Sequence, residues 1–391
     1  MTEANTVPGT PTTPADTTRH FAVWPKRLPR CMSAPETTLW ANLDITLRRF
    51  PDRVAFVFFD RSIRFRELHA RVESLAGWLQ QKAGVNKGDR VALCMQNSLQ
   101  FVIGYYAILR ADAVVVPVNP MNKAAELSHY ITDPGAKVAI CGSEIAAEWV
   151  AANRDVSAKD ASVTLQHLLV TRYCDEMTGG RLPDADVPAA WRAWLDFEAE
   201  LPEYATRWTD ALGAKLVATP ATAHADDMAV LPYTSGTTGL PKGCIHTHRT
   251  IGHNVVSGAV WGNGTMESVS LAVVPMFHIT GMLYGLHLPI YLGCTSVIMP
   301  RWDRELAGTL ISRHQVTSWT MIPTMMIDLF GSPNVAKFDL TSLVYIGGGG
   351  AAMPAAVAEK LWQQFGLRFV EGYGLTETAA PSHSNPPDAP K

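Results

Sequence analysis

The sequence predicts an α/β protein with two helix-flanked, mostly parallel sheets packed side by side in an αβαβα layering. Short apolar runs typical of buried strands alternate with helical patterns along most of the chain. A length of 391 residues exceeds what one hydrophobic core usually supports. A stretch at 174–226, rich in Ala, Asp and Pro, divides the alternation into two parts. We therefore expect a disordered tail at 1–30, a first subdomain at 31–225 that ends in this connection, and a second at 226–391.

The first half opens with the strand-like run RVAFVFF at 53–59. A helix follows, because apolar residues from Leu68 to Leu79 recur on one face, and Gly84 fits its C-terminal cap. Further strands are predicted at 90–95, 113–118 and 137–141, with helices at 98–110 and 123–133.

The second half repeats the pattern, with strands predicted at 228–233, 270–275, 295–299, 342–347 and 368–374. From Ser268 to Pro300 there is no charged residue, which is long enough to cross a bilayer. Repeated Pro, Gly and His residues interrupt it, so it is interpreted as a strand, a helix and a strand. The proline-rich end, PSHSNPPDAPK, predicts no closing helix or strand.

The net charge and the cysteine pattern limit the partners and the compartment that fit this chain. The net charge is −3 with a pI near 6.5, so nucleic acid and anionic membranes are poor default partners. At most a peripheral membrane contact is expected, and a homodimer is possible. The six cysteines form no CxxC pair, and the N-terminus has no apolar signal region, which fits a cytoplasmic protein.

The segment YTSGTTGLPKG at 233–243 concentrates hydroxyls, glycines and one lysine after a predicted strand. Such a loop can direct several donors and a positive charge at one polyphosphate. It is not the P-loop pattern, because Pro241 and Gly243 stand at the wrong positions. Taken alone, an ordinary surface turn would also explain its composition.

The segment resembles the signature loop of the adenylate-forming superfamily, which includes acyl-CoA synthetases, luciferase-like enzymes and peptide-synthetase adenylation domains. Three more family motifs follow in order: PMFH at 275–278, the glycine run before Ala351, and GYGLTE at 372–377. The resemblance covers about residues 35–391 and is closest to bacterial medium- and long-chain fatty acyl-CoA synthetases. It implies that ATP and a carboxylic acid give acyl-AMP, and that the acyl group passes to coenzyme A.

The resemblance also implies roles for single residues. Tyr373 is expected to stack on adenine, Thr376 to contact the α-phosphate, and Glu377 to hold Mg²⁺ together with Thr238. A solvated carboxylate at a helix start is the alternative for Glu377. The catalytic set is Thr234, Lys242, His278, Thr376 and Glu377. The nucleotide-binding set is Thr234, Ser235, Gly236, Thr237, Thr238, Gly239, Lys242, Gly348, Gly349, Gly350, Ala351, Glu371, Gly372, Tyr373, Gly374 and Thr376.

His278 informs the choice of acid. Amino-acid-activating relatives carry an Asp near this place to pair with the substrate ammonium, whereas a histidine is typical of acyl- and aryl-CoA synthetases. A packed core histidine is the alternative interpretation. The expected acyl pocket is apolar, which favours a medium- or long-chain fatty acid, with an aryl acid as the alternative. Its expected lining is His278, Ile279, Met282, Leu283, Met321, Met325, Gly347 and Gly348.

Two other interpretations fit parts of the sequence. Gly347, Gly349 and Ala352 satisfy a GxGxxA pattern with Glu371 downstream, which fits an NAD(P)-dependent dehydrogenase. That reading leaves YTSGTTGLPKG and GYGLTE unexplained. His246, His248, His253 and His278 suggest a metal cluster, but no Cys or carboxylate pattern supports zinc.

Members of the superfamily continue beyond GYGLTE with a ribose-binding Asp and a small C-terminal lid domain that carries a lysine. The given sequence contains no such region. The resemblance therefore implies that this chain binds nucleotide weakly and forms acyl-CoA hardly at all.

Overall fold

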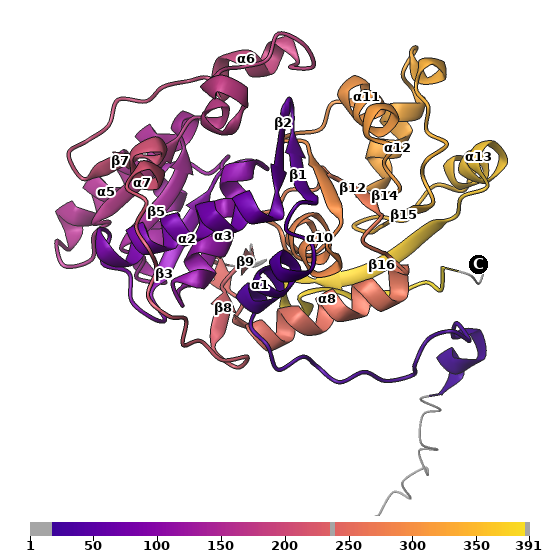
Figure 1. Ribbon diagram of the computed structural model, residues 1–391, viewed down its shortest axis with the longest axis horizontal. Coiled ribbons are helices and arrows are strands. Elements are labelled where there is room, and N and C mark those ends of the chain that lie inside the picture. The colour runs from indigo at the N-terminus through magenta and orange to yellow at the C-terminus, as the bar shows by residue number, and fades with distance from the viewer. Residues whose placement is uncertain (1–17, 235–238, 388–391) are drawn as a thin grey trace, which may run out of the picture.

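The computed structural model describes residues 18–234 and 239–387, and strands in this part form two large sheets and a short ribbon (Figure 1). Nearly all neighbouring strands within the two sheets run parallel, and helices flank both sheets. The α/β class with two mostly parallel sheets is confirmed.

The first sheet has the order β11-β8-β4-β3-β5-β6-β7. All its pairs are parallel except β11 with β8. Its strands are β3 (Arg90–Cys94), β4 (Val114–Pro117), β5 (Val138–Gly142), β6 (His167–Thr171), β7 (Ala205–Arg207), β8 (Met228–Val230) and β11 (His246–Thr247).

The second sheet has the order β17-β16-β15-β14-β12-β13-β1-β2. Only its two edge strands, β17 and β2, pair antiparallel with their neighbours. Its strands are β1 (Val54–Phe58), β2 (Arg61–Arg64), β12 (Val269–Ala272), β13 (Thr295–Ile298), β14 (Ser318–Met321), β15 (Tyr345–Gly348), β16 (Phe369–Leu375) and β17 (Ala380–Ser384).

The two sheets exchange strands between the halves of the chain. Strand β1 from the N-terminal half pairs with β13, with Val57 opposite Val297, while β8 and β11 join the first sheet. The boundary expected near residue 225 therefore does not separate the sheets. Strand pairing over long sequence separations decides membership of a sheet, and local periodicity carries no information about it.

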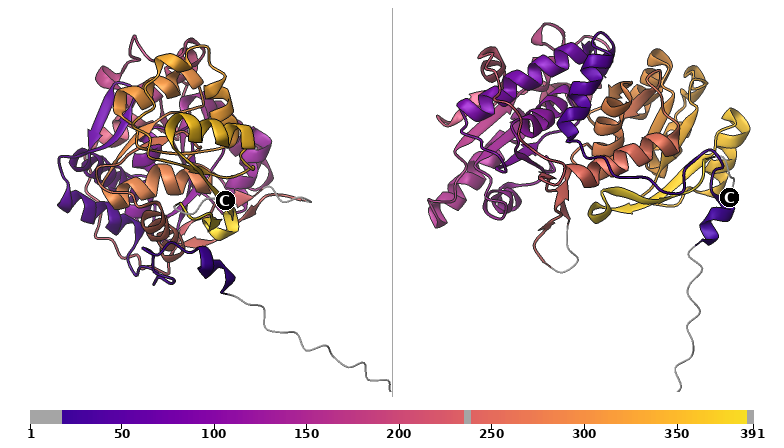
Figure 2. Two further views of the ribbon diagram at one scale, coloured as in Figure 1. Left: turned by 90° about the vertical axis from the view of Figure 1, so that its right-hand side faces the viewer. Right: turned by 60° about the horizontal axis from the view of Figure 1, so that its bottom comes forward.

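Helices cover the sheets and fill the space between them (Figures 1 and 2). A continuous core joins β1, α2 and α3 to strands β12 to β15, whereas a second core lies where α4 and α5 cover the first sheet. The main helices are α1 (Leu39–Arg49), α2 (Phe65–Gln81), α3 (Leu99–Arg110), α4 (Ala124–Thr132), α5 (Ala146–Lys159), α8 (His248–Gly262), α11 (Arg304–His314), α12 (Pro323–Phe330) and α13 (Ala355–Phe365).

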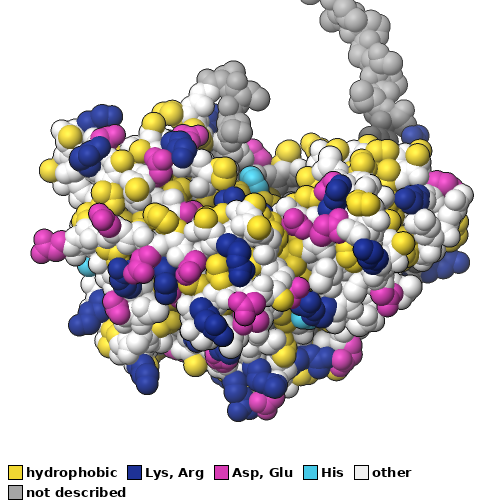
Figure 3. All heavy atoms as spheres, turned by 90° about the horizontal axis from the view of Figure 1, so that it is seen from above, with side chains coloured by type: hydrophobic (Ala, Val, Ile, Leu, Met, Phe, Trp, Pro, Cys, Tyr) yellow, Lys and Arg dark blue, Asp and Glu magenta, His cyan; other side chains and the backbone are white. Residues whose placement is uncertain are grey.

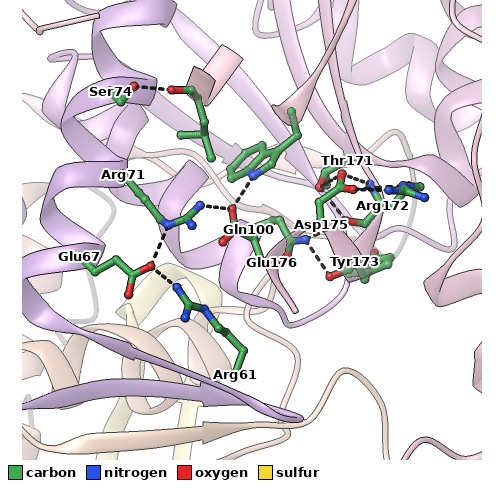
Figure 4. Close-up of polar contacts among 12 residues, drawn as sticks. Arg61, Glu67, Arg71, Ser74, Gln100, Thr171, Arg172, Tyr173, Asp175 and Glu176 are labelled. Carbon is green, nitrogen blue, oxygen red and sulfur yellow. Dashed lines mark hydrogen bonds and ion pairs between the residues drawn. The ribbon is translucent and has the colours of Figure 1, made fainter. Parts of the chain in front are cut away.

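The segment expected to connect the two subdomains packs on the first of them. It contains short elements, including the 3-10 helices η3 (Tyr173–Glu176) and η4 (Thr178–Gly180), the helices α6 (Ala189–Leu195) and α7 (Trp208–Gly213), and strand β7. The carboxylate of Glu176, buried at 2% exposure, accepts hydrogen bonds from Arg71 (2.6 Å) and from the Trp208 indole (2.8 Å). Figure 4 shows this network, in which Gln100 of α3 also donates to backbone carbonyls of η3. Paired polar groups of this kind keep a buried charge tolerable.

Both ends of the chain are more ordered than the sequence suggests. Residues 19–23, within the expected disordered tail, form the 3-10 helix η1 (Arg19–Val23). The expectation that no strand closes the chain is wrong, because β17 (Ala380–Ser384) pairs antiparallel with β16. Residues 381–384 align with a strand edge that only the folded sheet provides, which overrides their weak β-propensity.

The uncharged stretch from Ser268 to Pro300 forms a strand, a helical segment and a strand, as expected. Between β12 and β13 lie α9 (Ile279–Gly281), the π-helix η5 (Met282–His287) and α10 (Leu288–Leu292). In the described part of the chain, no helix has both the length and the apolarity to cross a membrane. On the face seen in Figure 3, side chains of Lys and Arg are interspersed with those of Asp and Glu.

Candidate functional site

The two described ends of the glycine- and hydroxyl-rich segment form a small ribbon. Strands β9 (Tyr233–Thr234) and β10 (Lys242–Gly243) pair antiparallel, with Lys242 opposite Thr234. Lys242 is exposed, as is Gly239 in the turn before it. The expected phosphate-binding residues Ser235, Gly236, Thr237 and Thr238 lie outside the described residues.

Helix α4 anchors the base of this ribbon. The Tyr233 hydroxyl donates to the carboxylate of Asp133, and the His129 Nε2–H donates to the carbonyl of Pro241 (2.9 Å). These contacts fix where the loop leaves the protein, so Thr234 and Lys242 project from a defined base.

The GYGLTE motif lies at the end of β16 and in the following turn. Thr376 and Glu377 belong to the 3-10 helix η7 (Thr376–Thr378), whose entry is capped by a hydrogen bond from the Leu375 N–H to the Thr378 hydroxyl (2.9 Å). Directly after it, Ala379 (φ 57°) and Ala380 (φ 85°) adopt left-handed backbone conformations. Such conformations cost non-glycine residues free energy and cluster at functional sites.

His246 joins this turn to the start of α8. Its Nε2–H donates to the carbonyl of Thr376 (2.7 Å), and the Asn254 amide of α8 donates to the carbonyls of Thr378 (2.9 Å) and Ala379 (2.8 Å). Burial lowers the pKa of His246, which keeps the imidazole neutral, although its bond to Thr376 and the charge of Glu377 oppose the shift. We assign His246 and Asn254 as positioning residues for Thr376 and Glu377.

Cys244 directly follows strand β10 and lies within electrostatic reach of the GYGLTE turn. Burial raises the pKa of the Cys244 thiol, the nearby Glu377 carboxylate raises it further, and a hydrogen bond with Thr234 lowers it. Thr234 and Glu377 are 143 positions apart in the sequence, and both interact with this one side chain. The structure thus brings Thr234, Thr376 and Glu377 into one neighbourhood.

The glycine run at the end of β15 is required by the close approach of neighbouring strands. A Cβ on Gly348 would lie 1.8 Å from the carbonyl oxygen of Met321, and one on Gly349 would lie 2.3 Å from that of Gly372. Gly350 has φ +83°, which favours glycine. At Gly348 and Gly349 the neighbouring backbone therefore occupies the space that a side chain would need.

A cleft of about 760 Å³ lies at the ends of β15 and β16. Its walls include several residues expected to bind nucleotide, and Tyr373 is 61% exposed beside it. The expected nucleotide-binding residues among its walls are Gly350, Ala351, Glu371, Gly372, Tyr373 and Gly374. A broad aromatic face beside exposed backbone can accept a flat heterocycle.

His278 is held in place by the first sheet. Asn97, which follows β3, accepts a hydrogen bond from the Met276 N–H (2.6 Å) and donates to the carbonyl of Val274 (3.1 Å). These bonds fix the turn that carries His278, whose side chain is exposed. Surrounding protein lowers the pKa of His278 by desolvation, so it is neutral at neutral pH.

The apolar side chains expected to line the acyl pocket lie in the core. Met282 and Leu283 are buried, and the Tyr105 hydroxyl donates to the Met282 sulfur (3.1 Å). Ile279, Met321 and Met325 are buried as well. Gly347 and Gly348 lie in β15, and a Cβ on Gly347 would meet the Tyr345 hydroxyl at 2.8 Å.

An apolar cavity of about 100 Å³ lies instead between α8, the η5 region and the second sheet. It runs from the turn beside His278, where Val274 and Gly281 line it, to the C-terminal end of α8. Its other walls include Leu271, Tyr284, Gly285, Leu288, Leu292, Val344 and Tyr345. None of the five expected apolar side chains from Ile279 to Met325 belongs to this lining among the described residues.

Metal binding by protein groups alone has little support in residues 18–234 and 239–387. No three His, Cys, Asp or Glu side chains there lie close enough together to hold an ion. His248 accepts a hydrogen bond from the Leu39 N–H (3.1 Å), and His246 bonds to Thr376. The exposed Glu377 offers one carboxylate, which suits Mg²⁺ because that ion commonly combines one or two carboxylates with substrate phosphates.

Sequence reasoning missed three residues that shape the site. Asn97 stands in a polar run directly after a buried strand, where ligand-side residues of parallel sheets gather, so its position was a usable signal. The sequence suggested His246 only as a possible metal ligand and did not indicate its hydrogen bond to Thr376. No local pattern marks Asn254, because its partners lie more than 120 positions away.

Comparison with known proteins gives a consistent result. A family model described as AMP-binding enzyme matches residues 43–391. A long-chain-fatty-acid–CoA ligase of Bacillus subtilis is 30% identical over 369 residues, covering 93% of this chain and 64% of the relative. A 4-coumarate–CoA ligase-like protein of Oryza sativa is 30% identical over 327 residues, covering 80% of this chain and 51% of the relative.

A solved structure has the same fold. The inhibitor-bound N-terminal domain of FACL13 from Mycobacterium tuberculosis superposes with a TM-score of 0.69 at 27% identity, covering 90% of this chain and 79% of that one. The chain spans less than two thirds of the length of the Bacillus relative. The family match includes the glycine run, which leaves the dehydrogenase interpretation without support.

Proposed function

Because the chain belongs to the AMP-binding enzyme family, we propose that it activates a carboxylic acid with ATP and transfers the acyl group to coenzyme A. One observation carries the proposal. The base of the phosphate loop (Thr234) and the GYGLTE turn (Thr376 and Glu377), far apart in sequence, converge around Cys244 and His246. A site that binds triphosphate and promotes attack on its α-phosphorus needs these two sets of groups together.

In the first reaction a carboxylate oxygen attacks the α-phosphorus of ATP. The new bond joins that oxygen to phosphorus, the bond to the bridging oxygen breaks, and pyrophosphate leaves with the electron pair. Thr234 and Lys242 bind the departing phosphates, and Thr376 donates to the α-phosphate. Charge grows on these oxygens, so donors that are already positioned stabilise the transition state.

Other residues bind and orient the substrates. Tyr373 packs against adenine in the cleft beside Gly350 and Ala351. Glu377 would hold Mg²⁺, together with Thr238, and the ion would supply positive charge against the phosphates. His246 fixes the Thr376 backbone. In the second reaction the thiol of coenzyme A displaces AMP from the acyl carbon, and the neutral His278 stands at the acyl entrance.

The acid is proposed to be a medium- or long-chain fatty acid. The cavity beside His278 is lined mainly by apolar groups, and its described lining contains no carboxylate to pair with a substrate ammonium. An unpaired ammonium there would cost several kcal/mol, on the order of the penalty for burying an isolated charge. The fatty-acid ligase relative agrees with this choice. An aryl acid is the second candidate, because the rice relative is named for 4-coumarate.

The reaction would take place in the reducing cytoplasm. All six cysteines are free, and four of them are buried. Thiols that stay unpaired in this way suit a reducing compartment.

A panel of acids tests the function. A form of the protein that carries the family's C-terminal lid domain is incubated with ATP, Mg²⁺ and one acid at a time, namely fatty acids of different length, benzoate, 4-coumarate and an amino acid. We expect fatty acids to give the greatest acid-dependent release of pyrophosphate, with coenzyme A required for thioester formation. Preference for an aryl acid would select the second candidate. No acid-dependent pyrophosphate release, together with no binding of ATP, would overturn the proposal.

A further inference from the structure

Helix α8 connects the two parts of the proposed site. Its N-terminal end follows His246, which bonds to the GYGLTE turn, and its C-terminal end supplies Gly258, Trp261 and Gly262 to the wall of the apolar cavity. A shift of this helix would therefore change the shape of the cavity.

The N-terminal segment from Trp24 to Leu39 lies along α8 over its whole length (Figures 1 and 2). At one end of the helix the Leu39 N–H donates to His248 Nδ1 (3.1 Å). Midway, Pro35 packs so closely on Gly252 that a Cβ there would lie 2.9 Å from the proline ring. At the other end Arg27 donates to the carbonyls of Val260 (3.2 Å) and Trp261 (3.0 Å).

The Arg27 contact is a helix cap. The last carbonyls of a helix have no partner within the helix, and they carry the negative end of its dipole. The guanidinium provides both donors and positive charge at this point. The terminal turn of α8 is thereby held by a residue more than 230 positions away.

Trp261 separates two spaces. Among the described residues it is the one shared by the linings of the apolar cavity and of the larger cleft beside Tyr373. Its indole N–H donates to the carbonyl of Asn385 (3.1 Å). Trp24 packs edge-on against its ring, with centroids 5.2 Å apart and an interplanar angle of 73°. The Trp24 ring therefore helps to fix the Trp261 ring in this partition.

We propose that Trp24 and Arg27 are positioning residues that hold Trp261 as the end wall of the acyl cavity and so set the upper length of the acid. This rests on the proposed function, since it assumes that a fatty acyl chain enters this cavity from the His278 side. The cavity of about 100 Å³ is small, whereas the cleft behind Trp261 measures about 760 Å³. When the wall is released and no nucleotide occupies the cleft, a longer chain can pass into it, so binding of the acids is measured without ATP.

The size of the effect follows from burial of methylene groups. Each additional buried methylene improves binding by about fourfold, because removing its apolar surface from water contributes roughly 0.8 kcal/mol. Beyond the length at which the chain reaches Trp261, further methylenes gain nothing in the native protein. In a variant with a released wall, the gain continues for one or two more methylenes, which is about tenfold in affinity.

The test measures dissociation constants for saturated fatty acids from about eight to about sixteen carbons by isothermal titration calorimetry. The proteins are the native chain, Trp24→Ala, Trp24→Phe, Arg27→Ala, Trp261→Ala and the control Lys26→Ala. Lys26 is an exposed cation on the same segment. Thermal unfolding of each variant shows which ones are folded.

We expect affinity in the native protein to level off with length. Trp24→Ala, Arg27→Ala and Trp261→Ala should move this limit to longer acids, with about tenfold tighter binding of the longest acids and unchanged binding of the shortest. Trp24→Phe keeps an aromatic edge and should restore most of the native limit, and Lys26→Ala should match the native chain.

An unchanged length limit in all three alanine variants would overturn the proposal. A uniform loss of affinity at every length would do the same, because it would show a merely structural role. If one variant fails to fold, the remaining two decide. Native protein that releases pyrophosphate with aryl acids and binds no fatty acid would overturn the inference while leaving ligase activity intact, whereas no response to any acid or to ATP would overturn both.

Discussion

Helix α3 and strand β16 show how unevenly burial is distributed over this fold. All 12 residues of α3 (Leu99–Arg110) are buried between the sheets, including Gln100 and Arg110. Of the seven residues in β16 (Phe369–Leu375), only Val370 is buried. The first element contributes apolar burial to the central core, and the second presents backbone and the Tyr373 ring to the cleft.

This difference indicates that α3 mainly determines stability and that β16 mainly determines ligand binding and catalysis. Buried apolar surface supplies most of the folding free energy, so changes in α3 should act on stability. The segment from Gly372 to Ala380 combines exposed side chains with two strained alanines, and it depends on contacts from α8 to keep its shape. Changes there should act on ligand binding and catalysis.

The largest expected effect is the loss of a core side chain in α3. Phe101 is fully buried and packs on Tyr105. Phe101→Ala should lower the free energy of unfolding by about 3–5 kcal/mol, because the cavity left behind cannot fully collapse. Leu375→Ala in β16, at a side chain that is 47% exposed, is the control and should change it by less than about 0.5 kcal/mol. Equal changes in the free energy of unfolding for the two variants, measured in urea, would contradict the contrast between α3 and β16.

The next effect is on chemistry. In a form of the protein that releases pyrophosphate, Glu377→Gln should lower the rate by about 100-fold or more, because it removes the charge that holds Mg²⁺ near the phosphates. Glu359→Gln changes another exposed carboxylate, one that accepts from Gln363 on α13, and should leave the rate unaltered. A rate for Glu377→Gln within about twofold of the native value would show that Glu377 does not hold Mg²⁺.

A smaller effect concerns the backbone of the GYGLTE segment. A Cβ on Gly374 would lie 1.9 Å from the carbonyl oxygen of Ala380, so Gly374→Ala must push β17 away from β16. We expect about 1–3 kcal/mol of destabilisation and reduced pyrophosphate release. Gly213→Ala, where the added methyl group meets no described atom within 4 Å, should be neutral or stabilising by less than about 1 kcal/mol. Unchanged unfolding of Gly374→Ala would contradict this account of the strand pair.

The smallest effect is a pH dependence of stability from the core. His287 contacts the hydroxyls of Tyr105 (3.1 Å) and Tyr106 (2.8 Å), and burial lowers its pKa to about 3. The unfolded chain binds a proton near pH 6.5, whereas the folded chain does not until about pH 3. The stability contribution of neutral His287 is therefore present above about pH 6.5 and lost as pH falls, by about 1.4 kcal/mol per pH unit.

His287→Gln removes this titration, so its free energy of unfolding should fall less steeply between about pH 6.5 and about pH 5 than that of the native chain. Urea unfolding at several pH values in this window measures the two slopes. Parallel slopes for the native chain and His287→Gln would show that His287 does not titrate as proposed.

The sequence determined much of the local structure. The strands at 90–95 and 137–141 and the helix around Leu68 appear where apolar periodicity indicated them, because that signal acts within a few turns or strand residues. The expected cap Gly84 is wrong, because Lys82 caps the helix. The sequence did not indicate that the two ends of YTSGTTGLPKG pair as β9 and β10.

The tertiary structure decided what depends on distant partners. Strand β1 pairs with β13, and residues 380–384 form β17 against β16. Trp24 and Arg27 pack on α8, and His246 donates to the carbonyl of Thr376. The tertiary structure also put Met282 and Leu283 into the core, so that the apolar cavity lies on the α8 side of the second sheet. A local pattern shows that a side chain is apolar or that a backbone is extended. Which surface it meets depends on strand pairing and packing between residues often more than 100 positions apart.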